Sequence, residues 1–484
     1  MQLNFSAENV IGLDKRETDK LNKLIEIFNY HSSKNAKKNK YYEGNISLAD
    51  VNLGIALPEG LSKLEIGCAW GSKTVDVLAS RSMFDGFVGA SGNDINQLNV
   101  IAANNRLVEE YAKACRDELK YGCTFATLSA DADIKCKIRF HSPQTAAGMW
   151  DGEKGRMSCG FAIVDSELSS DLMDWIPTVI NYHTDYHIWV LKFEKSDNNW
   201  HATPHAHKMG RPLMEPMIWN ATSNKPFGRS RIKEPVRRLI DGYVRTLANA
   251  TIGLEFATSP QKYLLGVTDE QYDALINQKF KQYVGSILAS TYNPETGSNP
   301  QFGQLPQGSI QPHVEMVRIL ATQFSAATGL SVSDTGVVND ANPTSSDAII
   351  AQTKSLVAMA EQLNRGNGET LHTIAVMALA IANNVKIEEL PASQTDVIAH
   401  FKNPAMPSLA TTADAAIKIA SAREGFANTD TFLEMIGFDQ ADIRRIKSEE
   451  RRNRGLEFLK DFTAEPEEEA AGTEGNEPNE DITE

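Results

Sequence analysis

The chain has 484 residues, 41% of them hydrophobic and 8% aromatic, which is ordinary for globular proteins and enough for a large core. No run approaches the roughly 18 apolar residues of a membrane helix, and the mixed, polar N-terminal segment lacks the apolar stretch of a signal peptide. We therefore expect synthesis inside the cell, no membrane segment and more than one structural region.

The formal charge of -15 is unevenly distributed. Ten acidic residues and no basic residue follow Lys460, so the rest of the chain is near -5, with 48 basic against 53 acidic residues. Proteins that hold DNA tightly concentrate Lys and Arg on one face, and neither number favours that. The acidic end, 463–484, has few apolar residues to bury and is predicted to be disordered.

The five cysteines form an odd set without a C-x-x-C pair, which argues against a disulfide framework and a zinc ribbon. We expect reduced, buried thiols at all five positions. They are Cys68, Cys115, Cys123, Cys136 and Cys159.

Helical periodicity dominates the first 120 residues. A helix is predicted over 16–30, with Leu21, Leu24, Ile25 and Phe28 at helical spacing. The polar segment that follows, up to Tyr-Tyr-Glu-Gly at 41–44, is predicted to be a connector. Two further helices are expected, from about 70 to 84 and from about 95 to 119.

Between 121 and 225 the period changes from helical to alternating, which predicts a strand-rich region. Apolar and polar residues alternate over 134–141, as expected for a half-buried strand. A second strand is predicted over 187–193, and the polar segment 196–199 before Trp200 is typical of a hairpin turn.

Helices return after Gly228. A long amphipathic helix is predicted over 232–255, and Pro312 and Gly329 are expected to begin and close another. The segment 291–311 between them is rich in Gly and Pro without periodicity, which predicts a loop with no regular element.

Thr344 and Asp347 resemble a capping box, which predicts a helix that runs to Gly366. A nearly all-apolar helix is expected over 371–382, in an interior or interface position. Three short helices are predicted near 411–424, 430–436 and 440–460.

No pattern in the chain predicts catalysis. His201, His205 and His207 could supply metal ligands, but no Cys, Asp or Glu stands at a fixed spacing beside them, and a polar turn is the better interpretation. The segment 67–74 lacks the glycine that must precede the lysine of a phosphate loop. We predict no catalytic residue, no cofactor and no metal.

Several segments, in order, resemble the portal proteins of tailed bacteriophages. In the second half these are a Phe-Gly-Arg-Ser segment before the long helix, a helix that ends in Thr-Gly, and an Asn-Pro-Thr-Ser-Ser-Asp-Ala-Ile helix start. The early Tyr-Tyr-Glu-Gly also matches the family, more loosely, as does a helix ending in Gly-Phe. The segments are 214–218, 227–232, 236–255, 302–305, 321–330, 342–349, 41–44 and 75–87.

The resemblance implies a mixed α+β, mainly helical portal fold with wing, stem, clip and crown regions, in a ring of twelve copies around a DNA channel. By the order of elements it assigns the following regions: wing 1–165, clip and adjoining stem 166–230, stem helix 231–256, stem-to-channel-loop segment 257–311, wing helices 312–384, crown helices 385–462 and acidic tail 463–484.

The resemblance also implies a location at the portal vertex of the virion, after assembly in the host cytoplasm. The implied partners are other copies of the chain, the terminase large subunit, major capsid and scaffolding proteins, a head-completion or adaptor protein, and double-stranded DNA that passes through without sequence-specific contacts.

Two sets of site residues follow. An interface between subunits is expected at Val236, Leu239, Tyr243 and Leu247. Channel contacts with DNA are expected from uncharged polar residues that touch DNA without holding it, namely Asn293, Asn299, Gln301, Gln304 and Gln307. Two other classes remain open: another oligomeric virion protein, such as an adaptor or capsid component, and a metal-dependent enzyme built on the three histidines.

Overall fold

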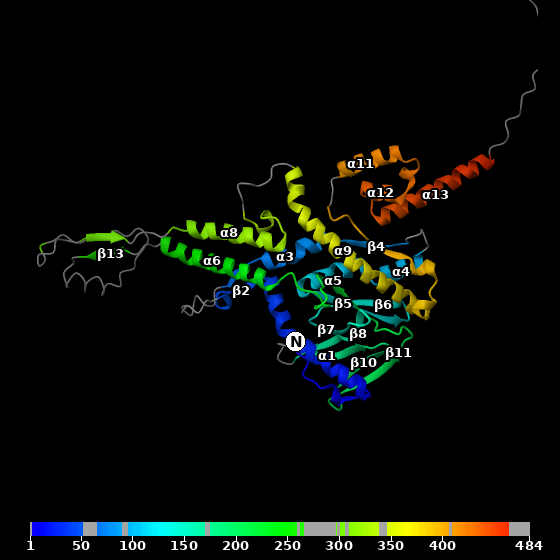
Figure 1. The fold of residues 1–484 in the computed structure, drawn as a ribbon, viewed down its shortest axis with the longest axis horizontal. Helices are drawn as coiled ribbons and strands as arrows, with labels where there is room; N and C mark the ends of the chain where they lie inside the picture. Colours follow the sequence, from blue (N-terminus) through cyan, green and yellow to red (C-terminus); the bar gives the residue numbers. More distant parts are fainter. Residues whose placement is uncertain are drawn as a thin grey trace, which may run out of the picture. The chain divides into compact units, whose positions relative to one another are not determined.

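The computed structural model describes residues 2–51, 65–89, 95–169, 175–258, 262–265, 297, 301–304, 309–337, 346–405 and 409–463. The chain divides into two compact units, Met1–Ala405 and Met406–Glu484 (Figure 1). None of the described helices is long and apolar enough to cross a membrane.

The first helix, α1 (Lys15–Glu43), is longer than its sequence pattern predicts. Asp14 caps its start by accepting a hydrogen bond from the Glu17 N–H, and Gly44 ends it in the left-handed conformation. The polar connector expected after residue 30 is therefore wrong. Tertiary contacts hold this part helical: Asn35 is buried and donates to the Pro143 carbonyl at 3.2 Å, and the Tyr41 hydroxyl donates to Asp241 at 2.6 Å.

The next two predicted helices differ from the structure. The helix expected over 70–84 ends early, as α3 (Trp70–Ala79), and is followed by the strand β4 (Phe84–Gly89). The helix expected over 95–119 is split into α4 (Asn96–Asn104) and α5 (Leu107–Tyr121). The split falls at Asn105, whose buried side chain bonds the backbone of Cys136 and Ile138 in a neighbouring strand. Long-range bonds of this kind leave no local sequence signal.

The predicted strand-rich region is confirmed as a six-stranded sheet in the order β1-β11-β10-β9-β8-β7, antiparallel except for the β1–β11 pair. One apolar cluster joins α1 to this sheet through Leu21, Leu24 and Phe28. The strands are β1 (Val10–Ile11), β7 (Ala146–Asp151), β8 (Arg156–Leu168), β9 (Trp175–His183), β10 (His187–Glu194) and β11 (Asn199–Ala206).

A three-stranded sheet carries the alternating strand expected over 134–141. It has the order β12 (Met214–Ile218), β5 (Cys123–Asp131) and β6 (Lys135–His141). Cys136 and Ile138 are buried while Lys135 and Lys137 are exposed, which confirms the half-buried face. All five cysteines are free and buried, as expected.

Three long helices complete the first unit: α6 (Glu234–Thr258), α8 (Gln311–Thr328) and α9 (Ser346–Asn383). The first two lie side by side, and α9 packs across the three-stranded sheet (Figure 1). Pro312 and Gly329 bound α8 as expected. The end expected at Gly366 is wrong, because α9 is continuous; Asn367 and Leu371 are fully buried there, and their contacts offset the roughly 1 kcal/mol cost of a helical glycine.

A further correction concerns 291–311, which was expected to contain no regular element. Strand β14 (Gln301–Gln304) lies there and pairs in antiparallel fashion with β13 (Lys262–Leu265). The strand partner is nearly forty residues away, so the local Gly and Pro content could not reveal it. Thr344 and the acidic end from 464 lie outside the described residues.

Short elements complete the first unit. Strand β15 pairs with β4, and β2 pairs with β3. Their bounds, with those of the short helices, are β2 (Asn45–Ser47), β3 (Glu65–Gly67), β15 (Val397–Phe401), α10 (Ala392–Thr395), η1 (Ala7–Asn9), η2 (Leu48–Val51), η3 (Ser333–Thr335) and η4 (Ile387–Glu389).

The second unit contains the three helices predicted for it. They are α11 (Leu409–Ala422), α12 (Asp430–Ile436) and α13 (Gln440–Thr463), with the short η5 (Phe426–Asn428) between the first two. Thr429 caps α12 by accepting from the Phe432 N–H, and Gly437 ends it in the left-handed conformation.

A buried polar network joins α5 to α9. Asn367 donates to Glu118 at 2.8 Å and to the Tyr111 hydroxyl at 3.0 Å, and Ser82 bonds Tyr111 at 2.6 Å. Glu118 is fully buried, and burial raises the pKa of its carboxyl to about 8.

Replacing Glu118 with Gln should flatten the pH dependence of stability. The folded chain holds a proton on Glu118 that the unfolded chain loses near pH 4.5, so the free energy of unfolding falls as pH rises from about 4.5 to about 8. Glutamine does not titrate and removes this slope. Urea unfolding at several pH values measures it, with the exposed Glu109→Gln as control; an unchanged slope in Glu118→Gln would contradict the assignment.

Candidate functional site

The segment 228–231 joins the strand-rich part of the first unit to α6. Gly228 has a φ of 66°, and a side chain there would overlap the Trp219 carbonyl oxygen, so only glycine fits. The Ser230 hydroxyl donates to the Lys120 carbonyl at 2.5 Å and accepts from the Ile232 N–H at 2.9 Å. The segment is thereby fixed to the C-terminal end of α5.

Arg231 is the centre of this junction. Only 7% exposed, it donates from Nε to the Thr74 carbonyl at 2.6 Å and from Nη2 to the Thr328 carbonyl at 2.7 Å. Its guanidinium also faces the Trp219 ring. Burial lowers the pKa of Arg231 to about 10, so it stays charged at neutral pH. One side chain thus ties α3 to the end of α8.

An aromatic contact reinforces the same junction. The Trp70 ring lies 4.3 Å from the Tyr243 ring on α6 and 4.7 Å from the Phe324 ring on α8, measured between centroids. Its indole N–H donates to the Thr335 carbonyl at 3.1 Å. Trp70 on α3 therefore contacts both α6 and α8.

Away from the anchor, α6 and α8 expose apolar side chains. Three of them are 42–49% exposed: Leu254 on α6, Val314 on α8 and Ile310 just before α8. A groove of about 460 Å³ runs between the two helices and is lined mainly by apolar groups. Within the described residues nothing covers this face, which we call the α6–α8 face. Contiguous exposed apolar surface of this kind marks interaction sites.

The four predicted interface residues lie in different environments. Val236 is completely buried in the chain's own core, and Leu239 and Tyr243 are half-buried against that core. Leu247 lines the groove. The interface itself stays a prediction.

The exposed residues on α8 were missed by the sequence reasoning. Its predicted stripe leads to Leu320 and Phe324, which are buried. Ile310 and Val314 continue the predicted stripe, which begins at Val317, toward the start of the helix at the same spacing, and they are the signal that was available.

The predicted channel residues are only partly described. Gln301 and Gln304 lie at the two ends of β14, and Gln301 is exposed. The remaining candidates, Asn293, Asn299 and Gln307, lie outside the described residues. Their contact with DNA stays a prediction.

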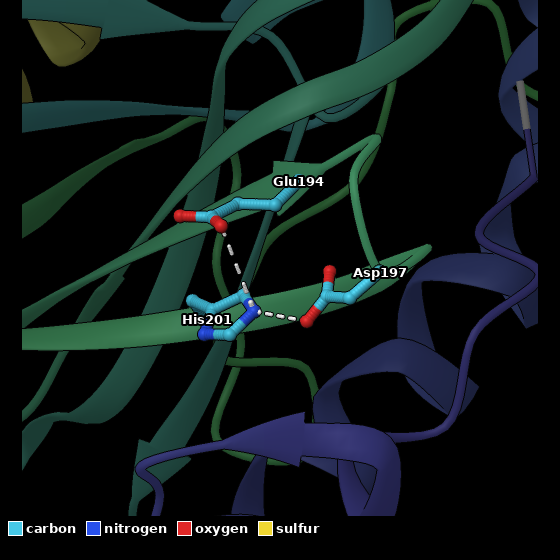
Figure 2. A group of neighbouring side chains, drawn as sticks. All are labelled: Glu194, Asp197 and His201. Carbon is cyan, nitrogen blue, oxygen red and sulfur yellow. Dashed lines mark hydrogen bonds and ion pairs between the residues drawn. The ribbon is translucent and has the colours of Figure 1, made fainter.

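The three histidines do not converge. His201 and His205 lie on one face of β11 but four residues apart, a separation of about 13 Å, and His207 contacts the Thr184 carbonyl. Instead His201 meets two carboxylates across the hairpin turn (Figure 2): its Nε2 lies 2.7 Å from Asp197 Oδ2 and 3.9 Å from Glu194 Oε2. These acidic neighbours were missed because strand pairing brings them together.

The Glu194–Asp197–His201 cluster offers three possible ligand atoms for a divalent cation. Both carboxylates are exposed, however, and His201 already makes a short hydrogen bond to Asp197 that clasps the turn. A structural zinc site has four protein ligands, one more than this cluster offers. The phosphate-loop-like segment is also explained by packing, because a side chain at Gly71 would overlap the Tyr41 carbonyl oxygen.

The sequence matches the family described as "Phage portal protein, SPP1 Gp6-like" over residues 21–455. The chain belongs to this family of phage portal proteins. Two segments that carry the resemblance to phage portals meet at Arg231, which stands in the first and binds the Thr328 carbonyl of the Thr-Gly helix end. No curated protein sequence matches the chain.

Solved structures similar to this portal-family chain include some from gene transfer agent particles. Two are "Neck of native GTA particle computed with C12 symmetry" (12% identity, TM-score 0.44) and "Virion of native gene transfer agent (GTA) particle" (11% identity, TM-score 0.43). In both cases the likeness covers 76% of this chain and 89% of the other. Likeness at this level adds nothing to the assignment, which rests on the family match.

Replacing Arg231 with Met should destabilise the first unit by about 2–4 kcal/mol, because the Thr74 and Thr328 carbonyls lose their charged donor in a buried place. Urea unfolding measures the loss. Arg238→Met removes an exposed ion pair with Glu234 and should cost under about 0.5 kcal/mol. Equal losses of unfolding free energy in the two variants would contradict the structural role of Arg231 at this junction.

Proposed function

We propose that the chain is the portal protein of a tailed phage or phage-like particle, forming a ring of about twelve copies at one capsid vertex. The family match supports the portal role, and the family is structural rather than enzymatic. The single structural observation that supports a ring is the exposed α6–α8 face.

A ring of identical subunits needs two complementary surfaces on each copy, because each contact joins different patches of neighbouring subunits. Stable interfaces of that kind have apolar cores. The α6–α8 face supplies an apolar surface on two rigid helices, whose geometry is fixed by the Arg231 and Trp70 anchors. Leu247, in the groove, is the predicted interface residue that best suits this role.

The regional roles remain part of the proposal. In it α6 is the stem helix and the β13–β14 pair belongs to the segment between stem and channel. The crown comprises the helices of the second unit, since β15, within the originally expected crown, pairs with β4 of the first unit.

In this role the ring would be the passage for DNA during packaging and ejection and the docking platform for terminase and head-completion proteins. The acidic overall charge supports passage without tight binding, because neutralising phosphates with Lys and Arg would hold DNA in place. Location in the virion, at the portal vertex, follows from the same proposal.

Charge on the α6–α8 face should prevent ring formation. Val314→Glu combined with Leu254→Glu places two carboxylates in the groove, where the proposal needs an apolar contact, so native mass spectrometry should show a 53.3 kDa monomer instead of a ring. Circular dichroism should be unchanged, because both side chains are exposed. Val100→Glu, at a similarly exposed position on α4, is the matched control and should keep the ring. Rings in the double variant would rule out this face as the interface.

Added positive charge in the predicted channel segment should slow DNA passage. Gln301→Lys together with Gln307→Lys would let the ring bind phosphates by counterion release, so packaging rates should fall, and more so at low salt. Gln301→Ser with Gln307→Ser keeps the positions uncharged and should package normally. If the lysine variant fills particles at the normal rate, these residues do not touch the DNA.

A further inference from the structure

Helix α13 carries five of the six arginines of the second unit (Figure 1). Four of the five lie on one side of the helix, because at 3.6 residues per turn they fall within a sector of about 120° around its axis. Between residues 442 and 456 the same sector contains Ser448 and Gly455 but no Asp or Glu. We call this surface the α13 arginine face, and its arginines are Arg444, Arg445, Arg451 and Arg452.

The α13 arginine face is open to solvent. The packed side of the helix lies elsewhere, since Ile443 is buried and Lys447 forms an ion pair with Asp430 of α12, and neither falls in the arginine sector. All four arginines are exposed, as are Ser448 and Gly455 between them. A side chain added at Gly455 would meet no neighbouring atom. Nothing in the described part of the chain therefore covers this face.

Most of the positive charge on this face is uncompensated. Arg445 forms an exposed ion pair with Glu449 at 3.3 Å, and the other ion pairs of α13 among the described residues involve basic side chains outside the face. Like charges on one face repel one another, and a polyanion along the helix would relieve that repulsion. The arginines without a described carboxylate partner are Arg444, Arg451 and Arg452.

The segment that follows α13 has the opposite charge. Ten acidic residues and no basic residue follow Lys460, and one of them, Asp461, still belongs to α13, which leaves nine acids in residues 464–484. The face and the acidic end thus match in charge and are joined directly in the chain. Charge complementarity of this kind selects one partner surface over others.

The acidic end is long enough to return along the helix. From the last residue of α13, Thr463, the helix extends back about 17 Å to Arg452 and about 29 Å to Arg444. An extended chain covers about 3.3 Å per residue, so Glu469 can lie about 20 Å from Thr463 and Glu474 about 36 Å. The first distance suffices to reach Arg452 and the second to reach Arg444.

The covalent connection favours this segment over a separate acidic protein. A single exposed ion pair contributes little to stability. A segment joined to the helix by a few residues, however, has an effective concentration in the millimolar range, so several weak pairs form together. A separate partner would need high affinity to displace it.

We propose that the α13 arginine face binds the chain's own acidic end, residues 464–484, which covers the face against nucleic acids and other polyanions. Uncovered, arginines on one helix face would bind phosphates by releasing counterions. With carboxylates already in place, a nucleic acid must first displace the acidic end. The contact lies within one copy and within the second unit, so it does not depend on ring formation.

A labelled peptide with the sequence of residues 464–484 tests the cover by fluorescence anisotropy at low salt. In the unaltered chain the tethered acidic end should compete with the peptide. A full-length chain with four acids neutralised should therefore bind the peptide at least about tenfold more tightly. Equal affinities of the two proteins would overturn the proposal. The substitutions in this neutralised chain are Glu467→Gln, Glu468→Gln, Glu469→Gln and Glu474→Gln.

Arginine variants of the neutralised chain locate the contact. Three substitutions on the face should weaken peptide binding about tenfold or more: Arg444→Gln, Arg451→Gln and Arg452→Gln. Three exposed basic residues of the same unit that lie off the face provide the control and should leave binding unchanged: Lys418→Gln, Arg423→Gln and Arg454→Gln. Both variants lose the same charge. Equal weakening would mean that net charge, and not the arginine face, attracts the peptide.

A short DNA duplex distinguishes a covered face from an open one. The neutralised chain should bind the duplex at least about tenfold more tightly than the unaltered chain, and the three substitutions on the face should remove that gain. Equal duplex binding by the unaltered and neutralised chains would mean that the face is open to nucleic acid, which would overturn the cover.

The Leu254→Glu, Val314→Glu variant shows which copy supplies the cover. It should bind the peptide as weakly as the unaltered chain, because the acidic end of the same copy remains in place. Peptide binding as tight as that of the neutralised chain would mean that a neighbouring copy covers the face, and it would overturn a contact within one copy.

Discussion

The buried guanidinium of Arg231 is the interaction on which the first unit depends. Its two hydrogen bonds to oxygen go to backbone carbonyls rather than to carboxylates, so it ties the middle of α3 and the C-terminal end of α8 to the segment just before α6. A carboxylate partner could have come from many directions, whereas two carbonyls in fixed helices allow few arrangements. The contacts of Arg231 set the positions of α6 and α8, and the exposed α6–α8 face results from these positions.

Patterns with a local cause were predictable. Pro312 and Gly329 bound α8, and the alternation around Cys136 gave β6, because both signals concern neighbouring residues. The three helices of the second unit were predictable for the same reason. Buried positions followed from periodicity, but periodicity cannot say whether an apolar stripe such as Val314 with Val317 is covered by the chain itself.

Features with a distant cause were not predictable. The second half of α1 is polar in sequence and stays helical because Asn35 and Tyr41 find partners far along the chain. The break at Asn105, the strand β14 and the acidic neighbours of His201 likewise depend on residues that only folding brings together.

The pairing of β4 with β15 has a consequence for synthesis. Gly89 pairs with Val397, so β4 waits for about 300 further residues before its partner exists. At 5–20 residues per second that is about 15 s to 1 min, during which Phe84 and Phe87 lack their final cover. The α6–α8 helices emerge inside this interval. A nascent chain would therefore expose these apolar helices before β4 can pair with β15. Whether the first unit folds before it associates with other copies then depends on the rate of translation.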